Sequence, residues 1–78
     1  MDARIKELSL LLMSLTGWEE DSRREPGEKV IRSWKGYPFE VLDQLEEECL
    51  LFQMRGTKSL ILTKEGIERA KELDKKYA

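Results

Sequence analysis

Histidine is absent from this chain, and cysteine occurs once, at Cys49. Without histidine, the chain cannot build a Ser-His-Asp triad, a Cys-His pair or a histidine-containing zinc site. A single cysteine excludes a disulfide within the chain and any metal cluster held by several of its own thiolates. A lone thiol fits a reducing compartment better than an oxidising one. We therefore expect a cytoplasmic protein that is not an enzyme and carries no metal or cofactor.

Long apolar segments are missing as well. The run Leu10–Met13 spans four residues, whereas a membrane-spanning helix needs about 20. The first residues also lack the basic start and the cleavage site of a signal peptide. These features again favour a cytoplasmic protein with no membrane segment.

Charge is abundant but balanced. The chain has 14 Lys and Arg against 16 Asp and Glu, a net charge of −2 over 78 residues. A domain that coats nucleic acid is usually basic, so this balance counts mildly against DNA binding. The length predicts a single domain over residues 1–78. A chain this short buries only about 60% of its unfolded surface, so a partner that covers apolar surface would stabilise it.

The first predicted helix is unusually apolar. Asp2 can cap it, Thr16 ends it, and Gly17 can provide a left-handed stop. One helical face carries Ile5, Leu8, Leu12 and Leu15, while Leu10, Leu11 and Met13 add apolar surface on other sides. Such a helix must be covered nearly all round. We therefore expect a homodimer that forms through the C-terminal helix and four leucines of this first helix: Leu8, Leu11, Leu12 and Leu15.

The next segments are less clearly patterned. Trp18–Glu25 is polar and acidic without a period, which predicts a loop. Pro26 suits a first helical turn and Gly36 suits a helix end, so Gly27–Lys35 is predicted as a helix. The alternative is a strand, which would place Val30, Arg32 and Trp34 on one face.

The second half has stronger signals. Pro38 opens a helix that runs to about Cys49. The short apolar segments Leu50–Gln53 and Leu60–Leu62 flank a polar turn that contains glycine, which predicts a hairpin. Thr63 can then cap a last helix, whose final turn carries Lys75 and Lys76 near its negative end.

This order of elements predicts an α+β fold of the winged helix-turn-helix type: three helices, a two-stranded wing and a C-terminal helix. The stretch from Phe39 to Leu51 is similar to the recognition-helix region of MarR- and PadR-type winged-helix regulators, and Lys58–Gly66 resembles their second wing strand and following helix. With Arg32–Tyr37 added, the chain resembles a family of small bacterial domains of unknown function. That family carries no established activity, so the resemblance transfers no functional residues. Cys49 departs from both families, which usually have glycine at the end of this helix.

The basic residues offer one candidate site for nucleic acid. If the second helix and the wing approach each other, five side chains could form a patch that contacts the DNA backbone: Lys29, Arg32, Lys35, Arg55 and Lys58. A wing arginine could enter a minor groove. The alternative is scattered charge that keeps the protein soluble. The predicted recognition helix argues against base reading, because it has five carboxylates, no Lys or Arg, and only Gln44 as a plausible reader. Its acidic face could instead be solvated or meet a basic protein.

Aromatic residues are the last candidates. Single-strand binders use exposed aromatics as stacking platforms for bases, and the residues that could do so are Trp34, Tyr37, Phe39 and Phe52. In so small a domain we expect them in the core, and we expect Cys49 to be a buried structural thiol. Two functions remain open: a small DNA-binding or regulatory module, favoured by fold analogy, and a scaffold for protein–protein interaction, favoured by the charge balance.

Overall fold

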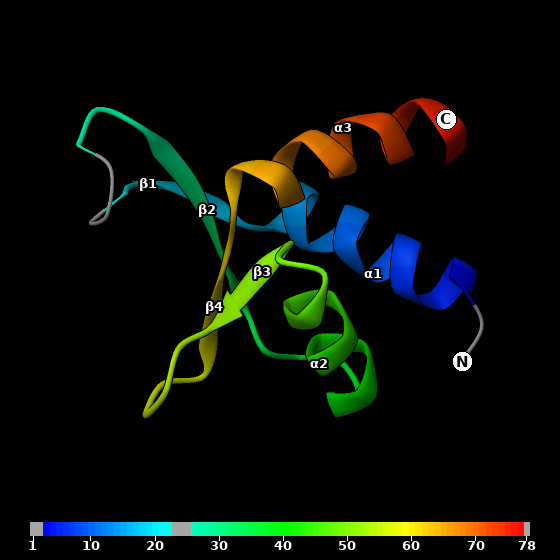
Figure 1. Ribbon diagram of the computed structural model, residues 1–78, viewed down its shortest axis with the longest axis horizontal. Coiled ribbons are helices and arrows are strands. Elements are labelled where there is room, and N and C mark those ends of the chain that lie inside the picture. Colours follow the sequence, from blue (N-terminus) through cyan, green and yellow to red (C-terminus); the bar gives the residue numbers. More distant parts are fainter. Residues whose placement is uncertain (1–2, 23–25, 78) are drawn as a thin grey trace.

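Three helices and four strands alternate along the chain in the computed structural model, which describes residues 3–22 and 26–77. The elements are α1 (Ala3–Thr16), β1 (Trp18–Asp21), β2 (Lys29–Trp34), α2 (Phe39–Glu47), β3 (Leu51–Gln53), β4 (Ser59–Leu62) and α3 (Lys64–Tyr77). The predicted cap Asp2 lies outside the described residues. The four strands form one antiparallel sheet in the order β1-β2-β4-β3. The helices lie together on one side of this sheet (Figure 1).

The core lies between the sheet and the helices. Successive side chains of a strand point to opposite faces, and the register pairs Ile31 with Leu62 and Leu62 with Leu51. These three residues therefore share the inner face of the sheet. The helices complete the core with buried residues from each: Leu10, Leu11 and Met13 from α1, Val41, Leu42 and Leu45 from α2, and Ala70 and Leu73 from α3.

The prediction of a helix over Gly27–Lys35 is wrong, and the strand alternative is correct. In β2, Ser33 is buried on the inner face, while Arg32 and Trp34 point outward. Pairing with both β1 and β4 stabilises the strand, and such pairing overrides weak local preference. The predicted loop after α1 also contains a strand, β1. The α+β class is thus confirmed, but the order is α-ββ-α-ββ-α, and the winged helix-turn-helix topology is not confirmed.

The second half of the chain agrees with the sequence-based prediction. Helix α2 and the β3–β4 hairpin form where their signals placed them. Thr63 caps α3, because its Oγ1 accepts the Gly66 backbone N–H at 3.0 Å. The same hydroxyl donates to the Cys49 carbonyl at 2.7 Å. Thr63 therefore joins the end of α2 to the start of α3.

Cys49 has the left-handed backbone geometry that favours glycine. Its φ is +61°, and its thiol is exposed, so the predicted burial is wrong. Left-handed geometry costs a non-glycine residue about 1–2 kcal/mol. We expect Cys49→Gly to raise the free energy of unfolding in urea by up to about 1 kcal/mol, because relief of strain outweighs the extra entropy of the unfolded chain. Cys49→Ala keeps the strain and should leave stability unchanged; equal stability of the two variants would contradict this account.

Candidate functional site

The five predicted nucleic-acid residues do not form one patch, since β2 is a strand. Lys29 lies at the start of β2 and pairs with Asp21, whose carboxylate raises the pKa of the lysine by hydrogen bonding and charge. In the middle of β2, Arg32 Nε donates to Glu20 Oε2 at 2.8 Å and Nη1 donates to Ser59 Oγ at 2.9 Å. Two of the five cations are therefore paired with neighbouring carboxylates.

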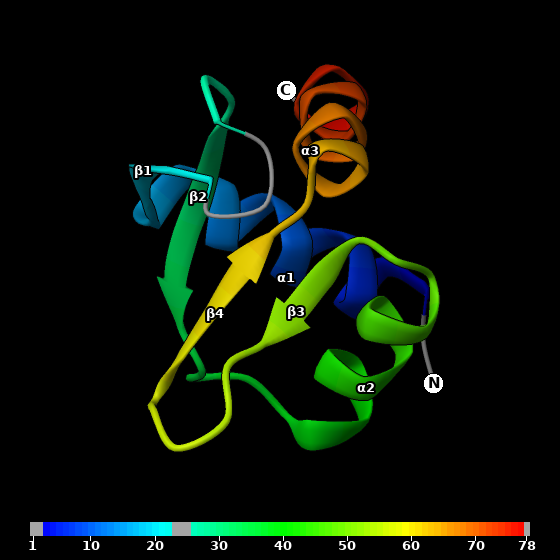
Figure 2. The same cartoon turned by 60° about the vertical axis from the view of Figure 1, so that its left-hand side comes forward.

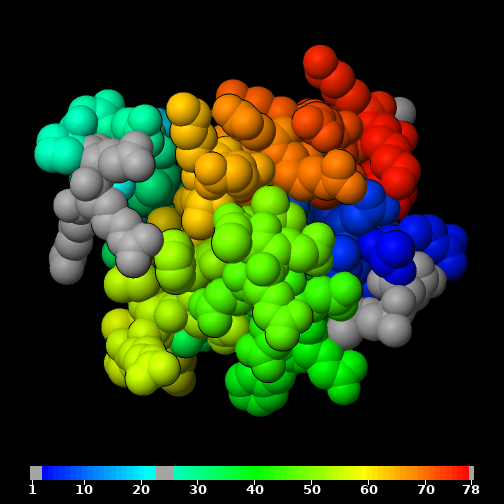
Figure 3. Space-filling view, viewed as in Figure 1, coloured from blue at the N-terminus to red at the C-terminus, as the bar shows by residue number. Residues whose placement is uncertain are grey.

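The other three basic residues gather at the opposite end of β2, around the β3–β4 turn. The Lys35 N–H donates to the Lys58 carbonyl at 2.8 Å, and Lys35 Nζ donates to the Met54 carbonyl at 2.7 Å. Arg55 follows Met54 in this turn, which projects at the lower left of Figure 3. We call Lys35, Arg55 and Lys58 the basic turn.

The outer face of the sheet is the unexpected feature of the molecule. Figure 2 views it with the strands in front of α1. One row of paired residues crosses all the strands: Trp18 opposite Arg32, Arg32 opposite Ile61, and Ile61 opposite Phe52. Outer faces of antiparallel sheets are commonly polar, but this row is mostly apolar and aromatic. A hollow of about 560 Å³ lies on it, lined in part by Val30, Phe52 and Ile61.

Aromatic residues on this face are exposed, contrary to expectation. Trp34 is 63% exposed and Phe52 44%. Phe39, at the start of α2, is 79% exposed. The prediction of core positions is wrong for these three residues and is supported only for Tyr37, which packs partly buried against the core. Sequence spacing alone could not decide this, because exposure depends on which face of the sheet the helices cover.

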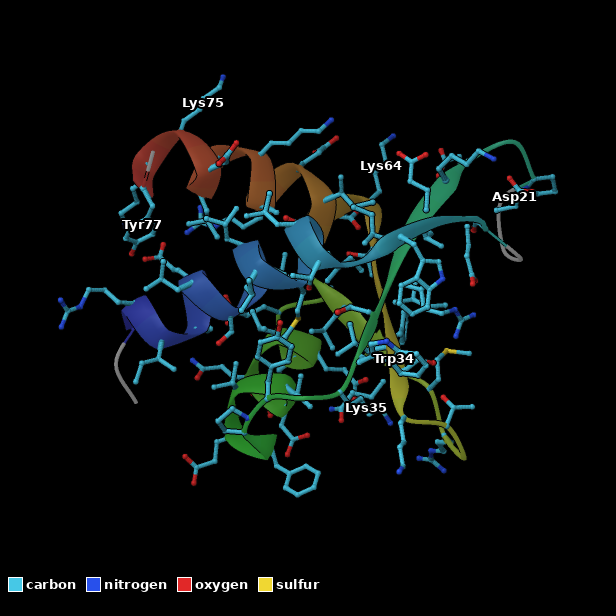
Figure 4. The ribbon with its side chains drawn as sticks, turned by 180° about the vertical axis from the view of Figure 1, so that it is seen from behind. Asp21, Trp34, Lys35, Lys64, Lys75 and Tyr77 are labelled. Atoms are coloured by element: carbon cyan, nitrogen blue, oxygen red, sulfur yellow. The ribbon has the colours of Figure 1, made fainter. Side chains whose placement is uncertain are left out.

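Two tryptophans form an ordered pair on the outer face. The ring centroids of Trp18 and Trp34 lie 5.4 Å apart, with the ring planes tilted by 57°. Trp18 Nε1 donates to Glu20 Oε1 at 3.1 Å, while the other oxygen of Glu20 binds Arg32. Figure 4 shows Trp34, the last residue of β2, close to Lys35, which follows the strand. Glu20 therefore fixes both Trp18 and Arg32 in place, and the tryptophan pair stands next to the basic turn.

The second exposed surface is one face of α1. Four aliphatic residues, which we call the α1 stripe, are each about half exposed or more: Ile5 50%, Leu8 45%, Leu12 49% and Leu15 66%. The predicted dimer surface also included Leu11, but this residue is 9% exposed and belongs to the core of its own chain.

The C-terminal helix packs against a different side of α1 within the same chain. Glu7 Oε1 accepts hydrogen bonds from Lys76 Nζ at 3.0 Å and from the Tyr77 hydroxyl at 2.8 Å, and Arg69 lies 3.6 Å from Glu7 Oε2. These partners lower the pKa of Glu7, Lys76 first among them. The small hollow at this junction is thus lined by a charge network that ties α1 to α3.

The carboxylates of α2 also take part in the fold. Glu46 accepts the backbone N–H of Gln53 at 2.7 Å, and Asp43 accepts its side-chain amide at 3.0 Å. Glu48, which follows the helix, pairs with Lys6 of α1 at 2.7 Å. Three of the five acidic residues therefore hold α2 to its neighbours.

Within residues 3–22 and 26–77, no group of three His, Cys, Asp or Glu side chains could hold a metal ion. No helix in this part of the chain is long and apolar enough to cross a membrane.

A scan of protein families matches residues 1–78 to a family described as a domain of unknown function, DUF6429. This agrees with the resemblance to small domains of unknown function, whereas no link to winged-helix regulators of the MarR or PadR type is shown. Neither the curated proteins nor the solved structures contain a match.

Proposed function

Since the chain belongs over its whole length to the DUF6429 family, whose function is unknown, we propose a function from its own surfaces: it is a protein-interaction domain that pairs with a second copy of itself. The observation that carries this proposal is the α1 stripe. Large exposed apolar patches on small proteins mark interaction sites.

The spacing of the stripe fits a partner helix of the same kind. Its residues follow one another at intervals of three, four and three, the repeat of the core positions in a two-helix coiled coil. Ser9 and Thr16, which adjoin the stripe in sequence, are uncharged, whereas Arg4, Lys6 and Glu7 adjoin its N-terminal end. An uncharged aliphatic seam is self-complementary, and a two-fold axis would place the same residues on both sides of the interface.

The charges at the ends of α1 favour an antiparallel pair. No acidic residue lies in the described first turn and no basic residue in the last turn, so the helix dipole is not offset by its own terminal side chains. In a parallel pair, helix ends of like sign would meet. In an antiparallel pair, the positive end of each helix adjoins the negative end of the other.

Charge placement favours this function over duplex DNA binding through α2. That helix and the residue after it carry five carboxylates, which phosphate groups would repel. Lys29 and Arg32 already bind carboxylates of β1.

We expect Leu12→Glu to convert the dimer into a folded monomer. Leu12 is 49% exposed, so the interface adds about half of the roughly 1.5–3 kcal/mol for full burial of a leucine, and symmetry removes this contribution twice. The dimer dissociation constant should rise about 10- to 100-fold, at about 1.4 kcal/mol per tenfold change. Sedimentation equilibrium measures it, and far-UV circular dichroism checks the fold.

Phe39→Glu is the matched control, because it makes the same kind of change at an exposed apolar residue outside the stripe. It should remain dimeric. A monomeric wild-type protein at about 100 μM, well above the micromolar range expected for a specific pair, would overturn the proposal. So would a folded Leu12→Glu variant that still dimerises.

A further inference from the structure

The outer face of the sheet lies on the other side of the molecule from the helical layer, so pairing through the α1 stripe leaves it open (Figure 2). We infer that this face binds single-stranded nucleic acid. Trp34 and Trp18 provide the stacking surfaces for bases, and the basic turn contacts the phosphates. This activity goes beyond self-association and does not depend on it.

The tryptophan pair suits base stacking. Trp34 is 63% exposed, and its neighbour Trp18 is held by Glu20. A ring that is already fixed loses little freedom when a base stacks on it. Every base has a π face, so stacking of this kind tolerates many sequences.

The basic turn supplies positive charge next to this pair. Trp34 is paired in register with Ser59, the residue after Lys58, and Lys35 follows Trp34 directly. Two carboxylates of β1 are offset by cations of β2: Glu20 binds Arg32 and Asp21 binds Lys29. Helix α2, which carries four carboxylates, lies on the helical side of the sheet (Figure 1). Arg55 of the basic turn also lines the hollow on the outer face, beside Phe52, so this face presents a cation next to its aromatic rings, as a single strand requires.

The face is large enough for more than one nucleotide. From β2 to β3 it crosses two strand spacings, about 10 Å, between Trp34 and Phe52. Exposed aromatics on other four-stranded sheets stack two or three bases. The hollow over Ile61 and Phe52 lies on the same face, and its lining combines apolar side chains with charged residues of both signs.

The protein carries its own reporter for a test, because its two tryptophans both lie on this face. We would titrate the full chain at low salt with oligo-dT, oligo-U and a DNA duplex, each about 12 nucleotides or base pairs long, within the usual range of single-strand sites. Stacking should quench the tryptophan fluorescence with both single strands or with one of them. Equal affinity for oligo-dT and oligo-U would mean that the protein contacts bases and phosphates but not the sugar. A preference for one of them would identify the natural ligand as DNA or RNA.

Three variants, measured by anisotropy of labelled strands, locate the site. Trp34→Ala should weaken binding about tenfold or more, and Trp34→Phe should restore most of the affinity. The double variant Arg55→Ala and Lys58→Ala should lower the salt slope by about 1.4, since each phosphate contact on a single strand contributes about 0.7. Phe39→Ala removes an even more exposed ring outside the face and should leave the affinity unchanged.

Several results would overturn the inference: no binding of either single strand at low salt, tighter binding of the duplex, or equal affinities of Trp34→Ala and the wild type. If neither single strand binds, the alternative ligand of the outer face is a protein partner. The Leu12→Glu monomer should retain its affinity per chain, which keeps this test separate from the test of dimerisation.

Discussion

Gly66→Ala is expected to lower the free energy of unfolding by about 3 kcal/mol, a large share of the roughly 4–12 kcal/mol available to a domain of this size. A Cβ at residue 66 would lie 1.9 Å from the Leu50 carbonyl oxygen and 2.9 Å from its carbon. Helix α3 would have to move away from Leu50. That movement would stretch the hydrogen bond in which Thr63 N–H donates to the same oxygen at 3.1 Å.

Urea unfolding measures the change in unfolding free energy, and the sign of this change shows whether α3 packs closely on Leu50. In a helix without such a contact, replacing glycine by alanine stabilises by about 1 kcal/mol. Gly36→Ala is the matched control, because nothing lies within 4 Å of its Cβ position and its φ is not positive. It should be neutral or stabilising by up to about 1 kcal/mol. A Gly66→Ala variant as stable as the wild type would mean that α3 does not pack this closely on Leu50.

Local sequence signals correctly predicted the elements that depend on contacts between residues close together in sequence. Helix α2, the β3–β4 hairpin and the Thr63 cap depend on residues near one another in sequence, and the structure has all three. Strand β2 differs, because it pairs with β4 about thirty positions away. Its sequence fits both periods, so only this long-range pairing decides between helix and strand.

The candidate surfaces show the same division. Helical spacing predicts the α1 stripe, and three of its four residues were already part of the predicted dimer surface. Leu11, the fourth leucine of that predicted surface, lies in the core and not in the stripe. The tryptophan pair could not be predicted, because Trp18 was assigned to a loop and Trp34 to a helix. Correct assignment of both β1 and β2 as strands would have placed Trp18 and Trp34 near each other on one face of the sheet. The basic turn was only partly predictable, since Lys35 reaches Lys58 through the register of β2 and β4.

A glycine can end a helix for two reasons, left-handed backbone geometry or close packing against a neighbouring element, and Gly17 illustrates the second. The sequence predicts a left-handed stop, but Gly17 is not among the described residues with positive φ. Its role is close approach: a Cβ would lie 2.6 Å from the Arg32 carbonyl oxygen, 2.6 Å from Ile31 Cγ2 and 2.7 Å from the Met13 carbonyl oxygen. The end of α1 therefore packs directly on the backbone of β2, one residue before β1 begins.

We expect Gly17→Ala to lower the free energy of unfolding by about 2 kcal/mol, and Gly17→Asn by at least as much, because either side chain forces α1 away from β2. A left-handed stop would instead accept asparagine at a small cost. Gly56→Asn provides the comparison, since Gly56 has a φ of +77° and open space around its Cβ position; it should cost less than about 1 kcal/mol. Urea unfolding of the three variants decides the matter. If asparagine were tolerated equally at residues 17 and 56, the left-handed stop would be right and the close packing of α1 on β2 wrong.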